Sequence, residues 1–537
     1  MIELAIIGGG PSAACVVQAV TQRLAPLAPV SITVFEPGPN LWRGRVFQPN
    51  GDEVLANVSM KDMSARAWDA DHGVRWLGDH NLAHLATDMA FSGRSLVGRY
   101  IEDSVDQAVA TLHSLGSRLR VEKQAVHELI MDKGRLRVHG DGWHAGPFNH
   151  AVLCVGAPAS YDHYQLAGAD GFVGDPYPLR QSQAEIPANA RVGIVGSGLT
   201  AVDVVMGLRA RGHQGPITMF SRKGMLPAVR RQPVKRELRH LTVSGVEHLA
   251  AQNEGLSVDD VTGLVLAELA DAGANVAAIK DDLACGAPAV QSLRDDLTRA
   301  QEDPDVGWSV LRDGMVVCGQ DAWFLLREEE KARMRASRQT LMRHCCPMPP
   351  GNAERLLGLF DTGQLDIIPG VHSIRPRPNG GFHIGAERDL TVDVVVAAST
   401  LAHHQPSPAA RPLLTSLSAQ GLVVEHRYGG IRVERTSSRL VTWRGVADPR
   451  LHALGDITHG AYLFTFEMPV LAMRADRIAE DIALTIEKGI RRDHLSVRDG
   501  QGAANAQAAG LPGPRRRAAA REAPVDSSGE AVRALRI

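Results

Sequence analysis

At 537 residues the chain is too long for one hydrophobic core, so two or three packed units are expected. Its hydrophobic content of 44% is ordinary for a globular enzyme. The net charge of -2 gives no electrostatic reason to expect nucleic acid or an anionic membrane as the main partner. A small-molecule substrate is therefore the better expectation.

The start of the sequence and its apolar segments indicate a cytoplasmic protein. An apolar strand predicted at 3–7 follows the first residue almost directly, with no charged region, apolar core or cleavage site of a signal peptide before it. No apolar run reaches the ~18 residues that are needed to cross a bilayer. We therefore expect no interaction with a membrane.

The first glycine loop lies between this apolar strand and a helical pattern. In such a loop Gly8 permits a tight turn and Gly10 lets the backbone approach a pyrophosphate, which the N-terminus of the following helix then binds. The next strand, predicted at 30–35, ends in Glu36, whose carboxylate can accept both ribose hydroxyls and would repel a 2′-phosphate. The predicted binding residues of the loop are Gly8, Gly9, Gly10, Pro11 and Ser12.

A second glycine loop again lies between an apolar strand and a helix. The strand after it, predicted at 217–220, ends in a hydroxyl and two cations, which suit the 2′-phosphate of NADP, although a solvated turn is the alternative interpretation. The strand after the first loop ends in an acid, and the strand after the second loop ends in two cations. Together these endings predict FAD at the first loop and NADPH at the second. The predicted residues are Gly196, Ser197, Gly198, Leu199 and Thr200 in the loop, and Ser221, Arg222 and Lys223 after the strand.

A third element supports this assignment. A short strand predicted at 451–456 ends in Gly455 and Asp456, just before a final amphipathic helix at about 469–490. In two-dinucleotide flavoproteins an aspartate at this place hydrogen-bonds the ribityl chain and the pyrophosphate side of the flavin. A Gly-Asp pair is also common in turns, but its position before the last helix favours the flavin role.

These patterns predict an α/β fold with two Rossmann-like dinucleotide-binding domains, for FAD and NADP, and a helical insert. The insert is expected to cap the flavin and to form much of the substrate pocket. The last segment is rich in Ala, Gly, Pro and Arg and lacks the large apolar residues that would offset its ordering entropy. The predicted division is an FAD-binding domain at 1–165 and 366–490, an NAD(P)-binding domain at 166–228, a mostly helical insert at 229–365 and a disordered tail at 499–537.

Neither the cysteines nor the histidines form a metal-ligand pattern, so no metal is predicted. The six cysteines include no CxxC pair, and the adjacent Cys345 and Cys346 are expected to be structural rather than redox-active. A cationic run at 230–239 could meet an acidic substrate or the cofactor phosphates. A solvated helix face is the simpler interpretation of this run.

With these motifs the sequence resembles the class B flavoprotein monooxygenases, which include flavin-containing monooxygenases, amine N-hydroxylases and Baeyer–Villiger enzymes. Within that group it is most similar to a large bacterial FAD–NAD(P)-binding family. The resemblance spans about 1–490 and implies that Gly156, at the end of a crossover strand predicted at 151–156, also lies at a cofactor. Besides the loops, the segments that carry it are 44–47, 95–100, 198–203 and 343–350.

The segment 57–64 is similar to the Asn-Thr-Ser-Lys-Glu-Met segment of flavin-containing monooxygenases, with one extra residue. In those enzymes the asparagine lies beside the isoalloxazine and helps to hold a C4a-peroxyflavin, which needs a fixed hydrogen bond and a dry pocket. The resemblance therefore makes Asn57 the catalytic candidate. A structural turn is the alternative role.

The favoured function is an FAD-dependent, NADPH-consuming monooxygenase that uses O₂ to form a C4a-peroxyflavin and oxygenates a heteroatom of a small molecule. The sequence lacks the His and Trp-Pro that the Baeyer–Villiger fingerprint has shortly before the second loop, so amine N-hydroxylation is favoured over ketone insertion. The alternatives are a flavin reductase or oxidase that passes electrons to a small acceptor, and a nucleotide-binding sensor without turnover. Analogy of fold suggests a homodimer.

Overall fold

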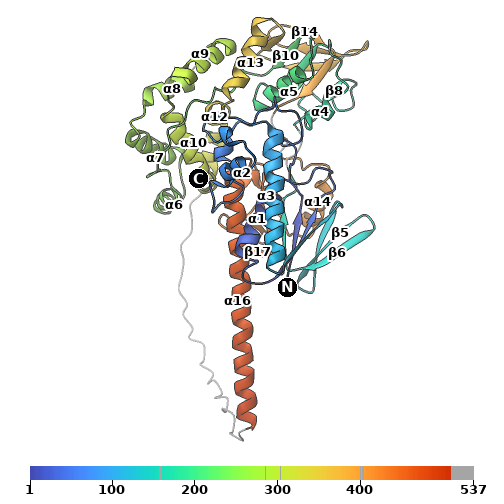
Figure 1. Cartoon of the computed structure of the whole chain (residues 1–537), viewed down its shortest axis with the longest axis vertical. Coiled ribbons are helices and arrows are strands. Elements are labelled where there is room, and N and C mark those ends of the chain that lie inside the picture. The colour runs from blue at the N-terminus through green and yellow to red at the C-terminus, as the bar shows by residue number, and fades with distance from the viewer. Residues whose placement is uncertain (157–159, 285, 303, 400, 402–403, 509–537) are drawn as a thin grey trace, which may run out of the picture. The chain divides into compact units, whose positions relative to one another are not determined.

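The computed structural model describes residues 1–508, except for 157–159, 285, 303, 400 and 402–403. By internal contacts, Met1–Ala483 is one compact unit and Leu484–Ile537 is a second. The described strands and both glycine loops belong to the first unit (Figure 1). None of the described helices is both long and apolar enough to cross a membrane.

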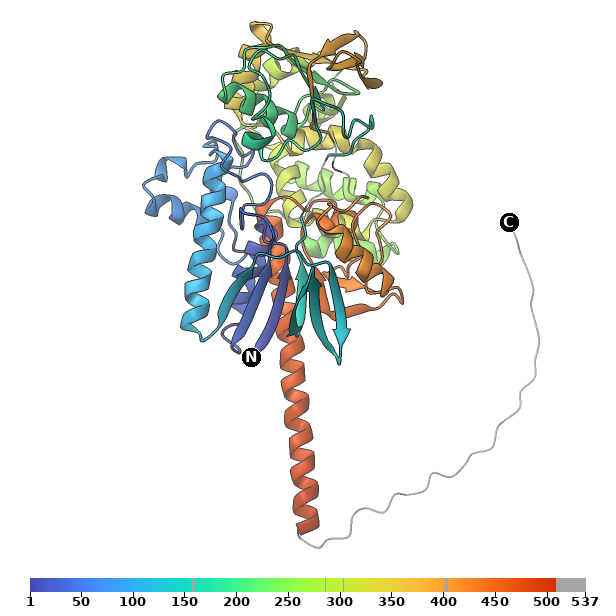
Figure 2. The same cartoon turned by 90° about the vertical axis from the view of Figure 1, so that its right-hand side faces the viewer.

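A six-stranded sheet carries the first glycine loop. Its central strand β1 (Ile2–Ile7) pairs in parallel with β2 (Val30–Phe35) and β7 (His150–Leu153), and the sheet order is β16-β17-β7-β1-β2-β3. These strands are almost fully buried apolar runs, as in most parallel sheets. Figure 2 shows the strands of this sheet side by side, with β1 and β2 in dark blue. The helices α1 (Pro11–Arg23) and α3 (Arg94–Ser114) pack on each other. The remaining strands are β3 (Arg118–Glu122), β16 (Arg439–Val441) and β17 (Ala447–Ala453).

A second, five-stranded parallel sheet carries the second glycine loop. The loop follows β9 (Val192–Val195), which pairs with β10 (Ile217–Phe220), and it leads into α5 (Leu199–Ala210). The order of the sheet is β11-β10-β9-β15-β8. The other strands are β8 (Phe172–Val173), β11 (Leu365–Ile368) and β15 (Val394–Ala397). A five-stranded parallel sheet and a six-stranded sheet in which only β16 is antiparallel, each with a glycine loop and a following helix, confirm the predicted α/β fold class.

One predicted boundary differs from the sheet pairing. The segment 366–490 was expected in the FAD-binding domain, but β11 and β15 pair with β10 and β9 in the second sheet. Parallel pairing gives each of these strands a buried apolar neighbour, which the first sheet would supply only at its edges. The chain therefore returns from the second sheet to the first only after Ala397.

Two further sheets are antiparallel and three-stranded. One consists of β4 (Glu128–Asp132), β5 (Arg135–Gly140) and β6 (Trp143–Phe148), and the other of β12 (Ser373–Pro376), β13 (Phe382–Gly385) and β14 (Leu390–Val392). The short helices outside the insert are η1 (Met60–Asp62), α2 (His72–Asp79), η2 (Ala83–Leu85), α4 (Leu179–Ser182), α14 (Arg411–Ala419), η3 (Asp456–Thr458) and α15 (His459–Tyr462).

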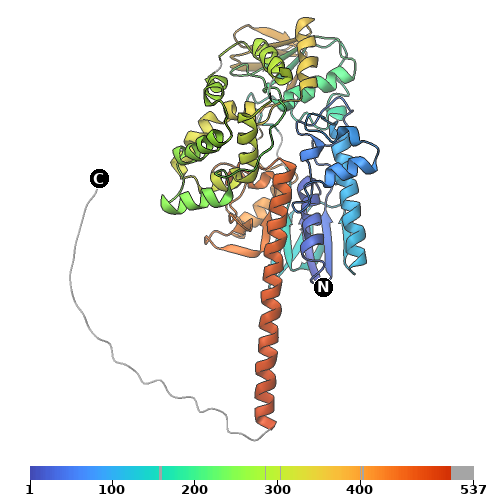
Figure 3. The ribbon, with the colours of Figure 1, turned by 60° about the vertical axis from the view of Figure 1, so that its left-hand side comes forward.

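The segment expected as an insert is mostly helical and contains α6 to α13 (Figure 3). Its core includes the buried indoles of Trp308 and Trp323. The indole N–H of Trp323 donates to the carbonyl of Gly460 in α15, at 2.9 Å, which ties the insert to the segment after Asp456. The helices are α6 (Val243–Gln252), α7 (Val258–Asp271), α8 (Val276–Ala284), α9 (Ala289–Glu302), α10 (Gly307–Val317), α11 (Gly319–Leu325), α12 (Glu328–Cys345) and α13 (Pro350–Asp361).

The last helix, α16 (Met468–Ala508), is longer than predicted. The first part of the tail expected to be disordered, 499–508, belongs to this helix. Four alanines in this stretch favour a helix, whereas Gly500 and Gly502 oppose it. The rest of that prediction, 509–537, lies outside the described residues.

Candidate active site

A large cavity extends from the first nucleotide loop to Thr200, at the beginning of α5. Its volume is about 640 Å³, within the range of sites that hold a whole cofactor. The first loop, from Gly8 to Ser12, lines it together with Glu36, Gly156 and Asp456. Thr200 from the second loop and Tyr177 from the segment before α4 line the same cavity. The predicted residues of the first loop, and Thr200 of the second, therefore meet at one site.

The first loop has the backbone that close approach to a phosphate requires. Gly8 has a φ of +100°, and a Cβ at this position would lie 2.1 Å from the carbonyl oxygen of Cys154. Only glycine therefore lets the end of β1 pass so near the end of β7. Helix α1 begins directly after Gly10 with Pro11 in its first turn, so its free N–H groups face the cavity side of the loop.

Glu36 directly follows β2 and lines the cavity with both carboxylate oxygens engaged. Oε2 accepts a hydrogen bond of 2.7 Å from the backbone N–H of Gly9, and Oε1 accepts one of 2.7 Å from Gly38. Each carboxylate oxygen has a second lone pair, so the group can still accept ribose hydroxyls. The acid is thus fixed at the position that recognises a ribose.

The Gly-Asp pair lies against the first loop. Gly455 has a φ of +89°, and a Cβ there would lie 2.5 Å from the hydroxyl oxygen of Ser12. Asp456 accepts a hydrogen bond of 2.7 Å from the hydroxyl of Thr465, and burial raises its pKa. Gly156, with a φ of +79°, lines the cavity beside it. The size of the cavity, the crowded glycines and the placed acids fit an FAD.

The backbone of the second loop also requires glycine where two strand ends lie close together. Gly196 has a φ of +121°, and a Cβ there would lie 2.3 Å from the carbonyl oxygen of Ala398. Gly198 precedes α5 as its N-cap, with no atom within 4 Å of the position of a Cβ, so a ligand can approach there. The hydroxyl of Ser197 donates to the carbonyl of Met225 at 2.6 Å. Gly196, Ser197, Gly198 and Leu199 are not among the described residues that line the large cavity.

The cations after β10 are exposed, whereas the hydroxyl is engaged. Ser221 Oγ accepts a hydrogen bond of 2.8 Å from the backbone N–H of Gly224, so it stabilises a turn. Arg222 and Lys223 are exposed. Burial lowers the pKa of His163 and raises that of Tyr164, and the charge of the nearby Arg222 acts to lower both pKa values. These two aromatic residues beside a cation were missed by the sequence analysis, because nothing local to 161–164 marks them.

Asn57 is half-buried and is not among the described residues that line the large cavity. Its backbone carbonyl accepts a hydrogen bond of 3.0 Å from Nη2 of Arg230. Arg230 in turn interacts electrostatically with Glu467, whose neighbours Phe466 and Met468 do line the cavity. The described contacts of Asn57 therefore connect it to the cavity wall only indirectly, through Arg230.

Arg230 is not on a solvated helix face, as the cationic run was expected to be. Its backbone N–H donates to the carbonyl of Met348 at 2.8 Å, in an irregular segment before α6. Burial, and then the charge of the nearby Arg312, lower the pKa of its guanidinium to about 10. Arg230 pairs with Met348, a residue far away in the sequence. This non-local pairing explains why the prediction of a solvated helix face was wrong at this residue.

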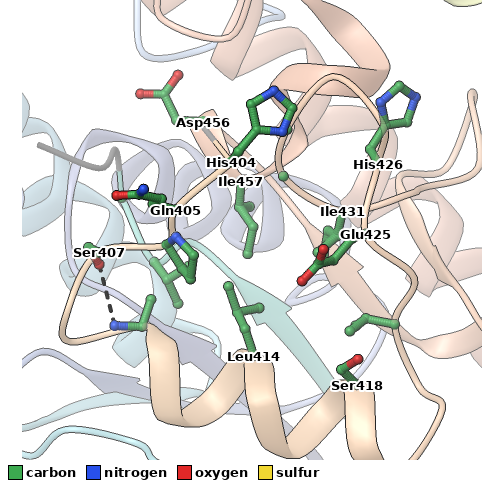
Figure 4. A pocket seen from close by; sticks show the side chains of 17 residues that line it. His404, Gln405, Ser407, Leu414, Ser418, Glu425, His426, Ile431, Asp456 and Ile457 are labelled. Atoms are coloured by element: carbon green, nitrogen blue, oxygen red, sulfur yellow. Dashed lines mark hydrogen bonds between the residues drawn. The ribbon is translucent and has the colours of Figure 1, made fainter. Parts of the chain in front are cut away.

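A small pocket adjoins the large cavity (Figure 4). Its volume is about 70 Å³, enough for a few water molecules, and the two spaces share Val155, Gly156, Ala410 and Asp456. Burial lowers the pKa of His426 in its wall to about 4, so this ring is neutral at pH 7. The other polar side chains of the lining are His404, Gln405, Ser407, Ser418 and Glu425.

The adjacent cysteines are buried thiols. Burial raises the pKa of Cys345 to about 12 and that of Cys346 well above its usual value. Neither thiol is therefore ionised at pH 7, and a thiolate is needed for disulfide exchange. Among the described residues, no group of three or more His, Cys, Asp and Glu side chains could hold a metal ion.

Comparison with known proteins agrees with the geometry. Residues 5–158 match the family model of FAD-NAD(P)-binding proteins. The fold is similar to the reduced form of ornithine hydroxylase from Pseudomonas aeruginosa, with 15% identity, a TM-score of 0.55 and coverage of 90% of this chain and 100% of that one. L-lysine 6-monooxygenase from Pseudomonas syringae is similar at 16% identity, a TM-score of 0.53 and coverage of 90% and 99%.

The FAD-bound cadaverine monooxygenase of desferrioxamine biosynthesis from Erwinia amylovora is similar at 12% identity, with a TM-score of 0.50 and coverage of 89% of this chain and 94% of that one. No curated protein matches the sequence. The family model confirms the predicted FAD- and NAD(P)-binding domain at the start of the chain. The similar structures show the fold, so the chain has a fold like that of ornithine hydroxylase and L-lysine 6-monooxygenase.

Proposed function

We propose that the protein is an NADPH-dependent FAD monooxygenase that inserts one atom of O₂ into a small molecule, with an amine nitrogen as the favoured acceptor. The observation that carries this proposal is the shared cavity, in which the first loop meets Thr200 and Tyr177 from the second nucleotide-binding segment. A hydride donor bound at the second loop can reach a flavin only in such a shared space. The named activities of the similar folds support the choice of amine oxygenation.

FAD would be held by residues spread along the cavity. Glu36 would accept the ribose hydroxyls, and the N-terminus of α1 would bind the pyrophosphate. Asp456 would hold the ribityl side. The rest of the cofactor would contact further residues of the lining, namely Val46, Phe47, Gln48, Thr465, Phe466 and Met468. Bound FAD supplies hydride acceptance and oxygen activation, which no side chain of the protein offers.

NADPH rather than NADH is proposed because Arg222 and Lys223 follow the strand that carries the ribose position. An exposed guanidinium can form two parallel hydrogen bonds to a phosphate. The hydroxyl of Ser221 is already used within the turn, so the two cations would carry the recognition of the 2′-phosphate. Gly198 would let the cofactor's pyrophosphate approach the N-terminus of α5.

Asn57 is proposed as the residue that supports oxygen transfer from just outside the cavity wall. Arg230 anchors its backbone carbonyl, so this contact does not use the side-chain amide of Asn57. A fixed donor in a site that excludes water stabilises charge without any reorganisation during the reaction. The segment 465–468, which includes Glu467, would separate the amide of Asn57 from the bulk solvent.

Rapid mixing tests the proposal. The purified protein is reduced with NADPH without oxygen, mixed with air-saturated buffer and followed by absorbance, with small amines added in parallel. A transient with a spectrum unlike that of oxidised or reduced flavin, and oxygenated product from an amine, are expected. Direct return to oxidised flavin with one peroxide released per NADPH, whichever amine is added, would instead favour the reductase or oxidase alternative.

A further inference from the structure

Three buried side chains from distant segments contact one another, and one of them, Tyr177, lines the large cavity. Arg94 is the first residue of α3, Asp203 lies near the beginning of α5, and Tyr177 lies just before α4. Their exposed fractions are 8%, 2% and 9%, so none of the three is a surface residue. We refer to them as the Arg94–Asp203–Tyr177 cluster.

One carboxylate oxygen joins the cluster. Oδ2 of Asp203 lies 2.8 Å from Nε of Arg94 in an ion pair, and it accepts a hydrogen bond of 2.5 Å from the hydroxyl of Tyr177. Burial raises the pKa of this hydroxyl, and Asp203 raises it further, so Tyr177 remains a donor. Removal of one partner of a buried ion pair is strongly destabilising, because it leaves the other charge unpaired. The cluster therefore fixes the position of α5 relative to α3.

Tyr177 is also held from its cavity side. The guanidinium of Arg45 lies 5.5 Å from the centroid of the Tyr177 ring, within the range of a cation–π contact. Arg45 forms an ion pair with Asp175, whose Oδ1 accepts a hydrogen bond of 3.0 Å from the backbone N–H of Tyr177. Arg45 and Tyr177 both line the cavity. The ring thus stands between the segment next to the flavin end and the helix of the second loop.

We propose that the Arg94–Asp203–Tyr177 cluster sets the depth at which the nicotinamide ring enters the cavity, and that Tyr177 is a positioning residue for hydride transfer. This inference rests on the proposed function, since it assumes that NADPH reduces FAD in this cavity. The step moves a hydride, with its electron pair, from nicotinamide C4 to flavin N5, which converts NADPH and FAD to NADP⁺ and FADH⁻. No other reactant is required.

The geometry explains why the seating of α5 matters for this step. Gly198 and Thr200 stand at the beginning of the helix whose fifth residue is Asp203, so a shift of α5 on α3 would move the bound cofactor with it. Hydride transfer needs donor and acceptor in contact, and a misplacement of about 1 Å can cost about 100-fold in rate. The cluster would act on the rate of hydride transfer more than on the binding of either cofactor.

Tyr177→Phe is the most selective test, because it removes one hydrogen bond and retains the ring and the Arg94–Asp203 ion pair. Tyr100→Phe is the matched control. Tyr100 is fully buried in α3, and its hydroxyl accepts a hydrogen bond of 3.1 Å from the backbone N–H of Ala65. It is not among the described residues that line the cavity. Both variants lose a buried phenol, but only one loses the contact with α5.

Anaerobic stopped flow at several NADPH concentrations separates rate from binding. Tyr177→Phe is expected to reduce its flavin about tenfold more slowly at saturating NADPH, with a Kd for NADPH within about threefold of wild type and an FAD content like that of Tyr100→Phe. Should Tyr177→Phe not fold, Asp203→Glu keeps the charge beside Arg94 but displaces the carboxylate by one methylene, and the same slowing is expected.

Wild-type rates in Tyr177→Phe, or an equal loss in Tyr100→Phe, would overturn the inference and leave the proposed function in place. A wild-type flavin that NADPH does not reduce would overturn the proposed function, and the inference with it. One set of measurements therefore distinguishes failure of this inference from failure of the proposed function.

Discussion

The carboxylate of Glu36 accepts a hydrogen bond from the backbone N–H of Gly9, with 2.7 Å between Oε2 and the nitrogen. This contact joins the end of β2 to the turn that leaves β1, so the ribose acid and the phosphate loop form one rigid unit. The second oxygen is held in the same way by Gly38. An acid fixed by backbone donors is preorganised for a ribose, because it need not change its conformation when the ligand binds.

Glu36→Gln is expected to weaken FAD binding about tenfold to hundredfold. The amide retains one acceptor but loses the charge, and a hydrogen bond to a charged group contributes about 1.5–3 kcal/mol. Fluorescence titration of the apoprotein with FAD measures the effect. Glu122→Gln is the control, since Glu122 ends the neighbouring strand β3 and is not among the described residues of the cavity wall. Equal affinities of the two variants would contradict the ribose role.

The two glycine loops predict opposite outcomes for one kind of substitution. Gly8→Ala would bring a Cβ to 2.1 Å from the Cys154 carbonyl at a φ of +100°, so loss of folded, flavin-containing protein is expected. Gly198→Ala meets no atom within 4 Å, so normal flavin content and an unchanged melting temperature are expected. Its Cβ would instead intrude on the second cofactor, and the KM for NADPH should rise at least about tenfold.

These measurements need only flavin absorbance, thermal denaturation and steady-state kinetics. A folded Gly8→Ala protein with full flavin content would show that β1 and β7 can separate without loss of the site. An unchanged KM in Gly198→Ala would show that the cofactor does not approach the N-terminus of α5.

Local patterns account for the parts of the fold that were predicted correctly. The strand predicted at 30–35 and its acid are β2 and Glu36, since an apolar run, a turn and a charged end are all encoded within a few residues. The sheet that β11 joins was not predictable in this way. Its partner β10 lies about 150 residues earlier in the chain, and a pairing over such a distance leaves no mark in either strand.

The site was predictable to the same extent. The glycines and Asp456 follow from local motifs, whereas Tyr177, Arg94 and Asp203 come together only in the folded chain. A buried arginine has no sequence signal that distinguishes it from a surface one. The only local sign was Asp203 itself, an acid in the otherwise apolar helix that follows the second loop.

Arg222→Ala is expected to reduce the preference for NADPH over NADH. If the guanidinium binds the 2′-phosphate, its loss should raise the KM for NADPH about tenfold to hundredfold and leave the KM for NADH nearly unchanged. Arg191→Ala is the control, since this exposed arginine of the same sheet is already paired with Asp393. Parallel increases in both KM values would contradict phosphate recognition and favour a general role of the turn.

The lowered pKa of the buried His344 predicts that the folded protein loses stability in acid. Burial, and then the charge of Arg343, lower the pKa of His344 to about 4, and its ring stacks on Trp308 with 4.3 Å between centroids. Because the unfolded ring titrates near pH 6.5, the unfolded state binds more protons between pH 6.5 and 4. The contribution of the neutral ring, at most about 3 kcal/mol, is therefore complete above pH 6.5 and is lost as the pH falls towards 4.

His344→Phe keeps a stacked ring that cannot be protonated, so its melting temperature should fall less between pH 7 and pH 5 than that of the wild type. His150 and His426, whose pKa values are also lowered to about 4, leave part of the acid effect in place. His248→Phe, at an exposed position of α6, should follow the wild-type profile. A profile of His344→Phe as steep as that of the wild type would mean that His344 does not contribute.

Asn57→Ala is expected to separate flavin reduction from oxygenation. The hydrogen bond that anchors this segment uses the backbone carbonyl of Asn57, so the substitution retains the contact with Arg230. Reduction by NADPH should proceed at the wild-type rate, because the nicotinamide is expected on the side of Tyr177 and Thr200. Oxygenated product should fall about 100-fold, the usual effect of losing one fixed donor, and peroxide release per NADPH should rise correspondingly.

Thermal denaturation distinguishes this role from that of a structural turn. Asn253→Ala, which removes an amide that donates to Asp260 at 3.1 Å in the insert, is the matched control. If Asn57 serves only the turn, its substitution should lower the melting temperature and the flavin content while the ratio of product to peroxide stays constant. If its amide supports oxygen transfer, the ratio changes and the melting temperature matches that of Asn253→Ala.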